Sequence, residues 1–282
     1  MIDGALPHLR CPVCRQPLER DDRTLRCPRR HSFDMARQGY ADLTAGRMPH
    51  VGDTAEMVAD RAAFLAAGHY DFIADALAGS TGGSTGGSTG GSTGGSTGGS
   101  LIVDAGTGTG HYLAHVLEAT AGATGLGLDV SKPGLRRAAR AHPRAAAVLT
   151  DLWRPLPIAD GVADVVLNVF APRNGPEFHR ILRPDGLLLV VTPEPDHLRE
   201  LVAAHDLIHV DPDKAARVQD ALGEHFKLDH TMPLRREMRL TATEARTLIG
   251  MTPSAHHLTE ATAPDGPATV TASVLVTAYR PV

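Results

Sequence analysis

Short apolar runs alternate with helix-like segments through the second half of the chain. Leu101–Val103 is a partly β-branched apolar run, and His111–Ala119, beyond a glycine-rich turn, has the composition of a helix. Runs of this kind predict buried strands, and strands that alternate with helices predict a doubly wound parallel sheet. The other expected strands are Gly125–Leu128, Ala146–Leu149, Ala163–Val169 and Gly186–Val191, and the other expected helices are Ser131–Ala141 and Gly175–Leu182. The pattern therefore predicts an α/β fold.

The pattern changes on either side of this region. Asp53–Leu77 has helical spacing of its apolar residues with a break at Gly68, so we expect two helices before the sheet. His197–His205 is expected to be a helix, and Leu234–Arg239 and Thr269–Tyr279 are expected to be strands. Two late strands that run antiparallel would complete the sheet.

A tandem GGST repeat, Gly79–Ser100, lies between the early helices and the sheet. It contains no apolar residue whose burial could offset the entropy of ordering it, so we expect a flexible linker. The expected organisation is an N-terminal module over residues 1–50, connecting helices over 51–78, the linker over 79–100 and an α/β domain over 101–282.

The first strand of the sheet leads into a glycine loop. Asp104 ends the apolar run, and Gly106, Gly108 and Gly110 follow at every second position. Glycines at this spacing let the backbone turn sharply and approach a ligand closely. An acidic side chain beside the loop disfavours a pyrophosphate and favours a cationic ligand, and S-adenosylmethionine carries both a sulfonium and an amino group. The loop resembles motif I of the class I methyltransferases.

Two further acidic residues follow later strands. Asp129 stands 19 residues after Gly110 and ends the second strand, where its carboxylate can accept hydrogen bonds from both ribose hydroxyls of such a cofactor. Asp151 follows the third strand and can accept a hydrogen bond from the adenine amino group. An aspartate in this place can equally serve only to form a turn, and the sequence leaves both interpretations open.

Four residues near the N-terminus have the spacing of a metal site. Cys11, Cys14, Cys27 and His31 form a C-x2-C-x12-C-x3-H pattern that includes all three cysteines of the chain. Two sulfurs on a tight turn can face one ion, and a second pair brought by a hairpin completes a tetrahedron, which suits Zn²⁺. Because the segment is too short to build a core of its own, we expect the metal to supply its folding free energy.

The N-terminal module is also rich in arginine. The chain has a formal net charge of −4, but residues 1–50 hold nine arginines and no lysine against six acidic residues. Arginine pairs well with phosphate, so an RNA contact is expected here, although charge alone predicts a solvated surface equally well. The arginines proposed to bind RNA are Arg10, Arg15, Arg26, Arg29 and Arg30.

The sequence shows no targeting feature. No apolar run approaches the length of a membrane span, and the N-terminus lacks the apolar core of a signal peptide. We therefore expect a cytoplasmic protein that does not bind membranes.

The segments CPVCRQPL…CPRRHSFDMARQGYADL, GDTAEMVADRAAFLAAGHY, VDAGTGTG, GLDVSK, NVFAP, TPEPDHLREL and MTPSA together resemble the RlmA family of 23S rRNA guanine-N1 methyltransferases. The likeness covers nearly the whole chain and is closest to the tylosin-resistance branch, the TlrB type. It implies a small N-terminal zinc-binding domain for RNA recognition, followed by a Rossmann-like class I domain that depends on S-adenosylmethionine. The GGST repeat departs from the family, whose members have an ordinary helical connection there.

The resemblance also implies a substrate and site residues. The target is a guanine in a domain II hairpin of 23S rRNA, which lines the peptide exit tunnel near the macrolide site. The zinc ligands are the four residues named above, and the residues near the cofactor are Tyr70, Gly110, His111 and His197, beside Asp104, Gly106, Gly108 and Asp129. The resemblance leaves open whether the protein forms a homodimer.

Guanine N1 carries a proton that must leave, and the sequence names no certain base. Asp196 and His197 follow a strand of the sheet and are the candidates, whereas Glu194 is interpreted as part of a polar loop. Two other functions remain open: a zinc-containing RNA-binding protein that holds the cofactor without catalysis, and a methyltransferase for a small molecule. The concentration of arginines favours RNA over a small molecule.

Overall fold

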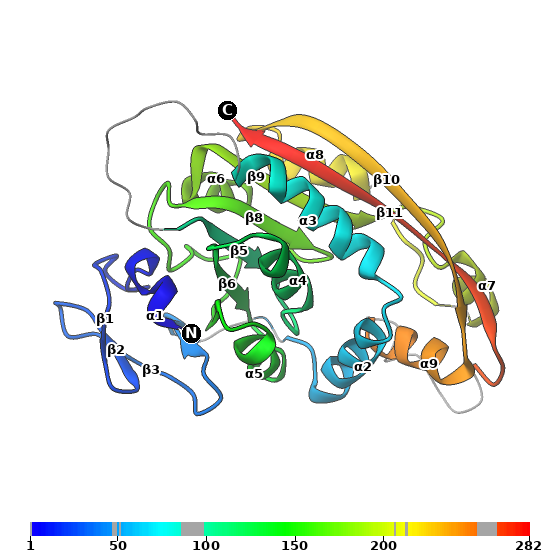
Figure 1. Cartoon of the computed structure of the whole chain (residues 1–282), viewed down its shortest axis with the longest axis horizontal. Coiled ribbons are helices and arrows are strands. Elements are labelled where there is room, and N and C mark those ends of the chain that lie inside the picture. Colours follow the sequence, from blue (N-terminus) through cyan, green and yellow to red (C-terminus); the bar gives the residue numbers. More distant parts are fainter. Residues whose placement is uncertain are drawn as a thin grey trace.

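The computed structural model describes residues 2–46, 50, 52–85, 99–205, 207–211, 214–252 and 264–282. Its centre is an eight-stranded sheet in the order β10-β11-β9-β8-β5-β6-β7-β4, in which every pairing among β4 to β9 is parallel and β11 runs antiparallel to both of its neighbours (Figure 1). The strands are β4 (Ala41–Asp42), β5 (Leu101–Ala105), β6 (Thr124–Asp129), β7 (Ala145–Leu149), β8 (Ala163–Val169), β9 (Leu182–Pro193), β10 (Phe226–Leu240) and β11 (Ala268–Pro281). The predicted α/β fold is confirmed.

Helices cover both faces of the sheet. One face packs against α3 and α4, and the other packs against α1, α6 and α8. The helices are α1 (Ile2–Ala5), α2 (Ala55–Ala66), α3 (Asp71–Thr85), α4 (His111–Ala119), α5 (Lys132–Ala141), α6 (Gly175–Ile181), α7 (Arg199–His205), α8 (Lys214–Leu222) and α9 (Ala242–Gly250), with a short 3-10 turn at Leu6–His8. The sequence pattern did not predict α1, α8 or α9.

The helix starts follow local chemistry. Ser131 caps α5 by accepting a hydrogen bond from the backbone N–H of Gly134, and Thr54 caps α2 in the same way from Met57. Thr241 and Glu244 form a reciprocal capping box at the start of α9.

The helix α3 continues into the GGST repeat, so the prediction of an unstructured linker from residue 79 is wrong for its first seven residues. The helix runs to Thr85, and Thr81 is buried with its hydroxyl donating to the carbonyl of Ala78. Ile73 and Leu77 anchor the preceding turns in the core, and each residue added to a helix already nucleated gains a backbone hydrogen bond, which offsets part of the poor helix propensity of glycine and serine. Residues 86–98 lie outside the described part.

The N-terminal module is a three-stranded antiparallel ribbon of β1 (Glu19–Asp21), β2 (Thr24–Arg26) and β3 (Ser32–Asp34). It is less separate than the expected boundary at residue 50 implies. The strand β4 leaves the ribbon and pairs with β7 at the edge of the large sheet, with Ala41 opposite Val148. Leu9 and Leu25 of the module lie in one hydrophobic cluster with Ile158 and other residues of the α/β domain. The ribbon therefore shares a core with the domain that follows it.

Arg15 fastens the ribbon to the α/β domain. Its guanidinium donates to the carbonyl oxygens of Leu156 and Ile158 at 2.6 and 2.8 Å and lies 3.4 Å from Asp160. Arg180 donates to the same two carbonyls from the other domain. This side chain was expected to bind RNA, but in the structure it binds at the interface between the two parts.

Among the helices that the structure describes, none is long and apolar enough to cross a membrane.

We expect Arg15→Met to destabilise the chain by about 1–3 kcal/mol, because it removes two charge-assisted hydrogen bonds at the ribbon interface while Arg180 still serves the same carbonyls. Denaturant unfolding measures the change. Arg29→Met is the matched control, since its exposed side chain has no hydrogen-bond or ion-pair partner among the described residues. Equal stability of the two variants would contradict the anchoring role of Arg15.

Candidate functional site

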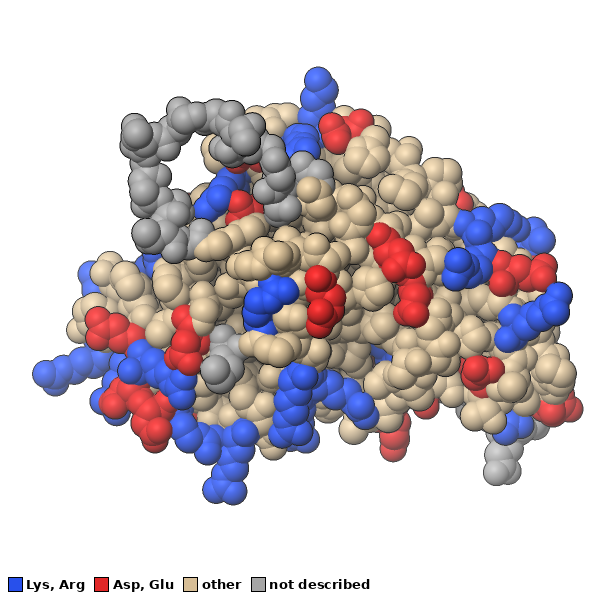
Figure 2. All heavy atoms as spheres, viewed as in Figure 1, with Lys and Arg blue, Asp and Glu red and all other residues tan. Residues whose placement is uncertain are grey.

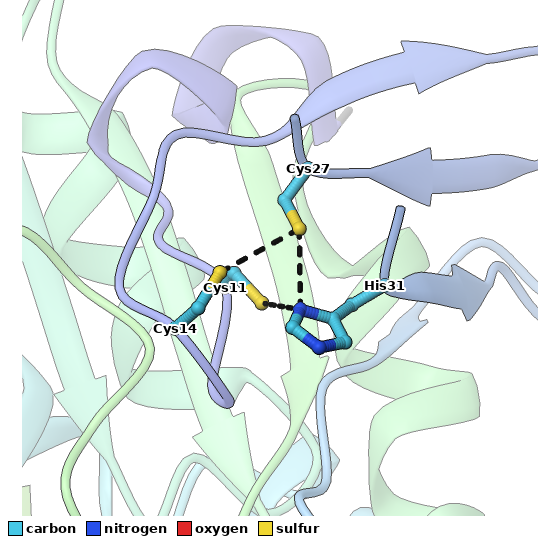
Figure 3. Close-up of side chains that lie close together, drawn as sticks. All are labelled: Cys11, Cys14, Cys27 and His31. Carbon is cyan, nitrogen blue, oxygen red and sulfur yellow. Dashed lines mark hydrogen bonds between the residues drawn. The ribbon is translucent and has the colours of Figure 1, made fainter. Parts of the chain in front are cut away.

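The three cysteines and His31 come together at one end of the ribbon (Figure 3). Their Sγ and imidazole nitrogen atoms all lie within 4.8 Å of one another. The Nδ1 atom of His31 is 3.5 Å from Cys11 Sγ and 3.3 Å from Cys27 Sγ, and the sulfurs of Cys14 and Cys27 are 3.6 Å apart. Three sulfurs and one imidazole at such distances form the donor set of a structural Zn²⁺ site, with His31 offering Nδ1.

Two tight turns create this geometry. The backbone N–H of Arg15 donates to the carbonyl of Cys11, and that of Arg30 donates to the carbonyl of Cys27. Both arginines have positive φ angles, 63° and 67°, which close each turn immediately after or beside a ligand. The four residues therefore assemble as their spacing predicts. One short turn carries Cys11 and Cys14, another carries Cys27 and His31, and the hairpin β1–β2 connects the two turns.

A cavity of about 890 Å³ opens at the carboxyl ends of the parallel strands. It lies where the strand order changes direction at β5, which is the ligand-binding edge of doubly wound sheets. Its size is that of a site for a cofactor together with part of a substrate. The glycine loop, the end of β6, the loops after β8 and β9, and residues of α2 and α9 line it.

The glycine loop and the end of β6 are tied together by Asp129. Its carboxylate accepts hydrogen bonds from the backbone N–H groups of Gly108 and Ser131, at 2.8 and 2.7 Å. Burial raises the pKa of Asp129, and the two backbone hydrogen bonds oppose that rise. Gly106 has a φ of +91°, and a Cβ there would lie 2.3 Å from the Cβ of Ala171, so only glycine fits.

Asp104 is the most unusual group of the site. It is 1% exposed, and neither carboxylate oxygen has a hydrogen-bond partner among the residues that the structure describes. Burial raises its pKa to about 7. A buried acid without a partner is costly, so its presence below the glycine loop indicates a missing donor or cation. That observation fits the amino and sulfonium groups of S-adenosylmethionine.

Aromatic side chains form another part of the cavity wall. The hydroxyl of Tyr70 is 3.3 Å from Nε2 of His197, and the ring of Phe170 lies 6.3 Å from that of Tyr70 and 6.1 Å from that of His197. Phe170 is 41% exposed and has a φ of +52°, which is strained for an aromatic residue. His111, at the start of α4, also lines the cavity, and burial lowers the pKa of its imidazole.

Asp151 has partners of its own. It is 3% exposed and lines the cavity, and its carboxylate accepts from the backbone N–H of Trp153 at 3.0 Å and lies 3.0 Å from Nδ1 of His50. The turn-forming interpretation of this residue is therefore visible in the structure. Its place at the cavity leaves an adenine contact as a prediction.

The two candidate bases separate in the fold. His197 lines the cavity, whereas Asp196 does not and is paired with Arg235, which lowers its pKa. Glu194 accepts a hydrogen bond from the hydroxyl of Ser273.

The predicted RNA-binding arginines also divide into two groups. Arg10 donates to backbone carbonyls of its own segment, Arg15 holds the interface, and Arg26 is paired with Asp21. Arg29 and Arg30 are exposed, and within the described residues their side chains have no partner.

Among the cavity-lining residues that sequence reasoning did not assign to the site are Arg61, Trp153, Phe170 and Arg173. Arg61 reaches across from α2 to Asp53 and to the carbonyl of Met251, close to the glycine loop. An aromatic residue directly after an apolar strand, as in NVFAP, is the one signal that would have found Phe170.

We expect the wild-type chain to hold one tightly bound zinc ion, and Cys14→Ser to lose it and unfold at lower temperature. Elemental analysis and thermal unfolding measure both. Because the ribbon shares a core with the α/β domain, we expect the loss to lower the unfolding temperature of the whole chain. A wild-type protein with well under one zinc per chain would refute the site.

Asp104→Asn should stabilise the ligand-free chain at pH 8 and have no effect near pH 4. The unfolded carboxyl titrates near 3.8, whereas the folded one holds its proton to about pH 7, so its ionisation destabilises the fold progressively between these values. Thermal unfolding across this range measures the difference. The control is Asp160→Asn, which should destabilise at pH 8 because Arg180 lowers the pKa of that exposed carboxyl. A uniform loss of stability in Asp104→Asn would mean that the carboxylate has a partner.

Comparison with known proteins agrees with both parts of the site. Residues 9–45 match the N-terminal zinc-ribbon model of RlmA, and residues 102–186 match a methyltransferase domain. A Micromonospora griseorubida protein that bears the name of a 23S rRNA (guanine-N(1)-)-methyltransferase is 54% identical over the whole of both chains. The 23S rRNA (guanine(748)-N(1))-methyltransferase of Streptomyces fradiae is 46% identical over 91% of this chain and 89% of its own. A relative of Bacillus subtilis is 31% identical over 80% and 78%. The chain belongs to the RlmA family of 23S rRNA guanine-N1 methyltransferases.

Proposed function

We propose that this enzyme methylates N1 of the guanine in the domain II hairpin of 23S rRNA that corresponds to the guanine named for the Streptomyces fradiae relative, and that the product confers resistance to tylosin-type macrolides. The observation that carries the proposal is the unpartnered, buried Asp104 below the glycine loop of a cavity that Tyr70, Phe170 and His197 also line. In this proposal the carboxylate attracts the positive end of the cofactor from below the glycine loop, and the aromatic residues of the cavity hold the base. A ribosomal substrate also places the protein in the cytoplasm.

S-adenosylmethionine supplies a methyl group that its sulfonium already activates. In the proposed site Asp104 faces the positive end of the cofactor, and Gly108 lets the backbone approach it. The carboxylate of Asp129 is already oriented by two backbone N–H groups, so its remaining lone pairs can accept from the ribose hydroxyls. Asp151 and His111 complete the set proposed for the cofactor, together with Tyr70 and His197.

The aromatic wall is suited to a base taken out of its stack. Phe170 presents an exposed ring at the cavity, and a splayed nucleobase stacks readily on such a surface. The strained backbone of Phe170 would then hold the ring in position at a cost that the surrounding loop bears. Guanine in this place brings its N1 edge toward the side of the cavity where Tyr70 and His197 meet.

His197 is the better placed of the two candidate bases. Its Nδ1 accepts a hydrogen bond from the backbone N–H of Ser273 at 3.1 Å and lies 3.0 Å from the carbonyl oxygen of the same residue, and its Nε2 lies 3.3 Å from the hydroxyl of Tyr70. The N–H of Ser273 favours the tautomer with the proton on Nε2, and the other tautomer, whose Nδ1–H donates to the carbonyl of Ser273, is the one in which Nε2 can accept a proton. We assign it the removal of the proton from N1, directly or through the Tyr70 hydroxyl. Nothing in this scheme requires a second copy of the chain.

The direct test is methylation of unmodified 23S rRNA, or of a domain II hairpin transcript, with radiolabelled S-adenosylmethionine. A methyl group on N1 blocks Watson–Crick pairing, so primer extension should stop next to the target guanine. Gly108→Val should abolish the stop and weaken cofactor binding measured by calorimetry, because a β-branched side chain is strained at its φ of +52° and would face the cofactor.

Gly79→Ala is the matched control, since a Cβ at this helical position meets nothing within 4 Å. It should behave as the wild type does. Cofactor binding without methyl transfer to any RNA would indicate a binding protein. Transfer only to small molecules would indicate the other alternative function. Expression in a tylosin-sensitive host then tests the resistance.

A further inference from the structure

The exposed face of α5 carries only positive charge. Lys132, Arg136, Arg137 and Arg140 are all exposed, and the helix contains no acidic residue. Within the part of the chain that the structure describes, these four side chains have neither a hydrogen-bond partner nor an ion-pair partner. On the opposite face Leu135 and Ala138 are buried against Tyr40 and Leu149.

This arrangement costs stability. Lys132 and Arg136, and likewise Arg136 and Arg140, stand four residues apart, where like charges on a helix repel each other. Lys132 also lies in the first turn, where the helix dipole disfavours a cation. The Ser131 cap and the buried face hold α5 in place without help from these side chains. Arg140, in the last turn, interacts favourably with the helix dipole, but the stability of the fold does not account for Lys132, Arg136 and Arg137.

The zinc ribbon continues the same surface. Two acidic residues of the N-terminal module, Asp3 and Asp21, are paired with Arg20 and Arg26, and three others, Glu19, Asp22 and Asp34, are exposed. Several other arginines of the module form no ion pair with the described residues. Among these are Arg29, Arg30 and Arg37, which are exposed and have no side-chain partner among the described residues.

The loop that carries Arg37 follows β3 of the ribbon and packs against α5. Ala36 and Tyr40 on either side of it pack into the hydrophobic cluster of α5, and a Cβ at Gly39 would lie 3.5 Å from that of Ala139. In Figure 2 the blue side chains run along the lower edge of the molecule from the ribbon to the region of α5.

The other end of α5 meets the cavity. A Cβ at Gly134 would lie 2.8 Å from the carbonyl oxygen of Gly108, and Ser131 donates its backbone N–H to Asp129. The glycine loop also contacts the last turns of α5, because a Cβ at Gly110 would lie 2.8 Å from the Cα of Ala138, so the helix lies alongside this loop over its length of about 15 Å.

We propose that Arg29, Arg30 and Arg37 of the ribbon and the cationic face of α5 form one continuous surface that binds the phosphate backbone of the substrate RNA and guides the target hairpin to the cavity. The inference rests on the proposed function, because it takes the substrate to be RNA. Guanidinium groups suit phosphate, and a polyanion would relieve the repulsion along the helix. One continuous row of phosphate contacts would then connect the ribbon, which recognises the RNA, with the cavity, where the methyl group is transferred.

The test is the double variant Arg136→Gln with Arg140→Gln in the full-length zinc-loaded chain. We measure its affinity for the domain II hairpin transcript at several salt concentrations. We expect RNA binding about tenfold weaker near physiological salt, and a slope of log affinity against log salt that is shallower by about one to two. Methylation should fall through a higher KM with kcat unchanged. Cofactor affinity should stay the same, since neither side chain lines the cavity.

The matched control is Lys227→Gln with Arg239→Gln, which removes the same charge from exposed positions on β10 at the opposite edge of the sheet. It should bind RNA as the wild type does. If the α5 variant and the wild type have equal RNA affinity and equal salt slopes while both methylate the hairpin, the α5 surface is refuted and the proposed function stands. If the wild type neither binds nor methylates the RNA, both proposals fail. Equal losses in the α5 and β10 variants would mean that only the overall charge matters, which also refutes this surface.

Discussion

Two backbone hydrogen bonds to the carboxylate of Asp129 hold the functional half of the molecule together. They join the end of β6 to the glycine loop through Gly108 and to the start of α5 through Ser131. The loop after β5 and the start of α5 are therefore both bound to one half-buried acid, and the N–H groups of Gly106 and Thr107 also bind the loop to the carbonyl of Leu128 at the end of β6. The carboxylate of Asp129 therefore couples the position of the glycine loop to that of α5. Neither the loop at Gly108 nor the start of α5 at Ser131 can move without losing its hydrogen bond to this carboxylate.

The second constraint is the attachment of the zinc ribbon. The metal site organises the two turns that carry its ligands, but its position relative to the cavity comes from elsewhere. The strand β4 adds to the edge of the sheet beside β7, and Arg15 binds the carbonyls of the loop at Leu156 and Ile158. A ribbon attached by a strand, a shared core and a guanidinium is held at a defined distance from the cavity, which suits an enzyme that must present one nucleotide of a large RNA.

Two features of the structure reduce its stability in the absence of ligands. Asp104 is a buried carboxyl without a partner, and α5 bears four exposed cations without partners among the described residues. In each case a ligand of opposite charge would supply the missing interaction. The charges are already in place in the ligand-free protein and need not be reorganised when a ligand of opposite charge binds. The stability that the ligand-free protein lacks therefore adds to the free-energy difference that favours the bound state.

The sequence by itself determined the features that depend on neighbouring residues. Apolar periodicity predicted the strands from β5 to β9, Ser131 predicted the start of α5, and the C-x2-C-x12-C-x3-H spacing predicted a cluster that two turns and a hairpin assemble. These signals are local, because turns, caps and strand ends are set by residues a few positions apart.

Only the tertiary structure decided which distant residues meet. The sequence does not distinguish Arg15 from the other arginines of its segment. Its role follows from the fold, which places it beside the carbonyls of Leu156 and Ile158, more than 140 positions later in the sequence. Phe170 and His197 meet because they follow the paired strands β8 and β9, and Tyr70 joins them because it precedes α3, which packs on the same face of the sheet. The helix α3 extends into the GGST repeat because its earlier turns are buried, a long-range effect that overrides the preference of glycine and serine for irregular structure. Side chains of one type and one local context thus acquire different roles, because burial and partners are properties of the folded chain.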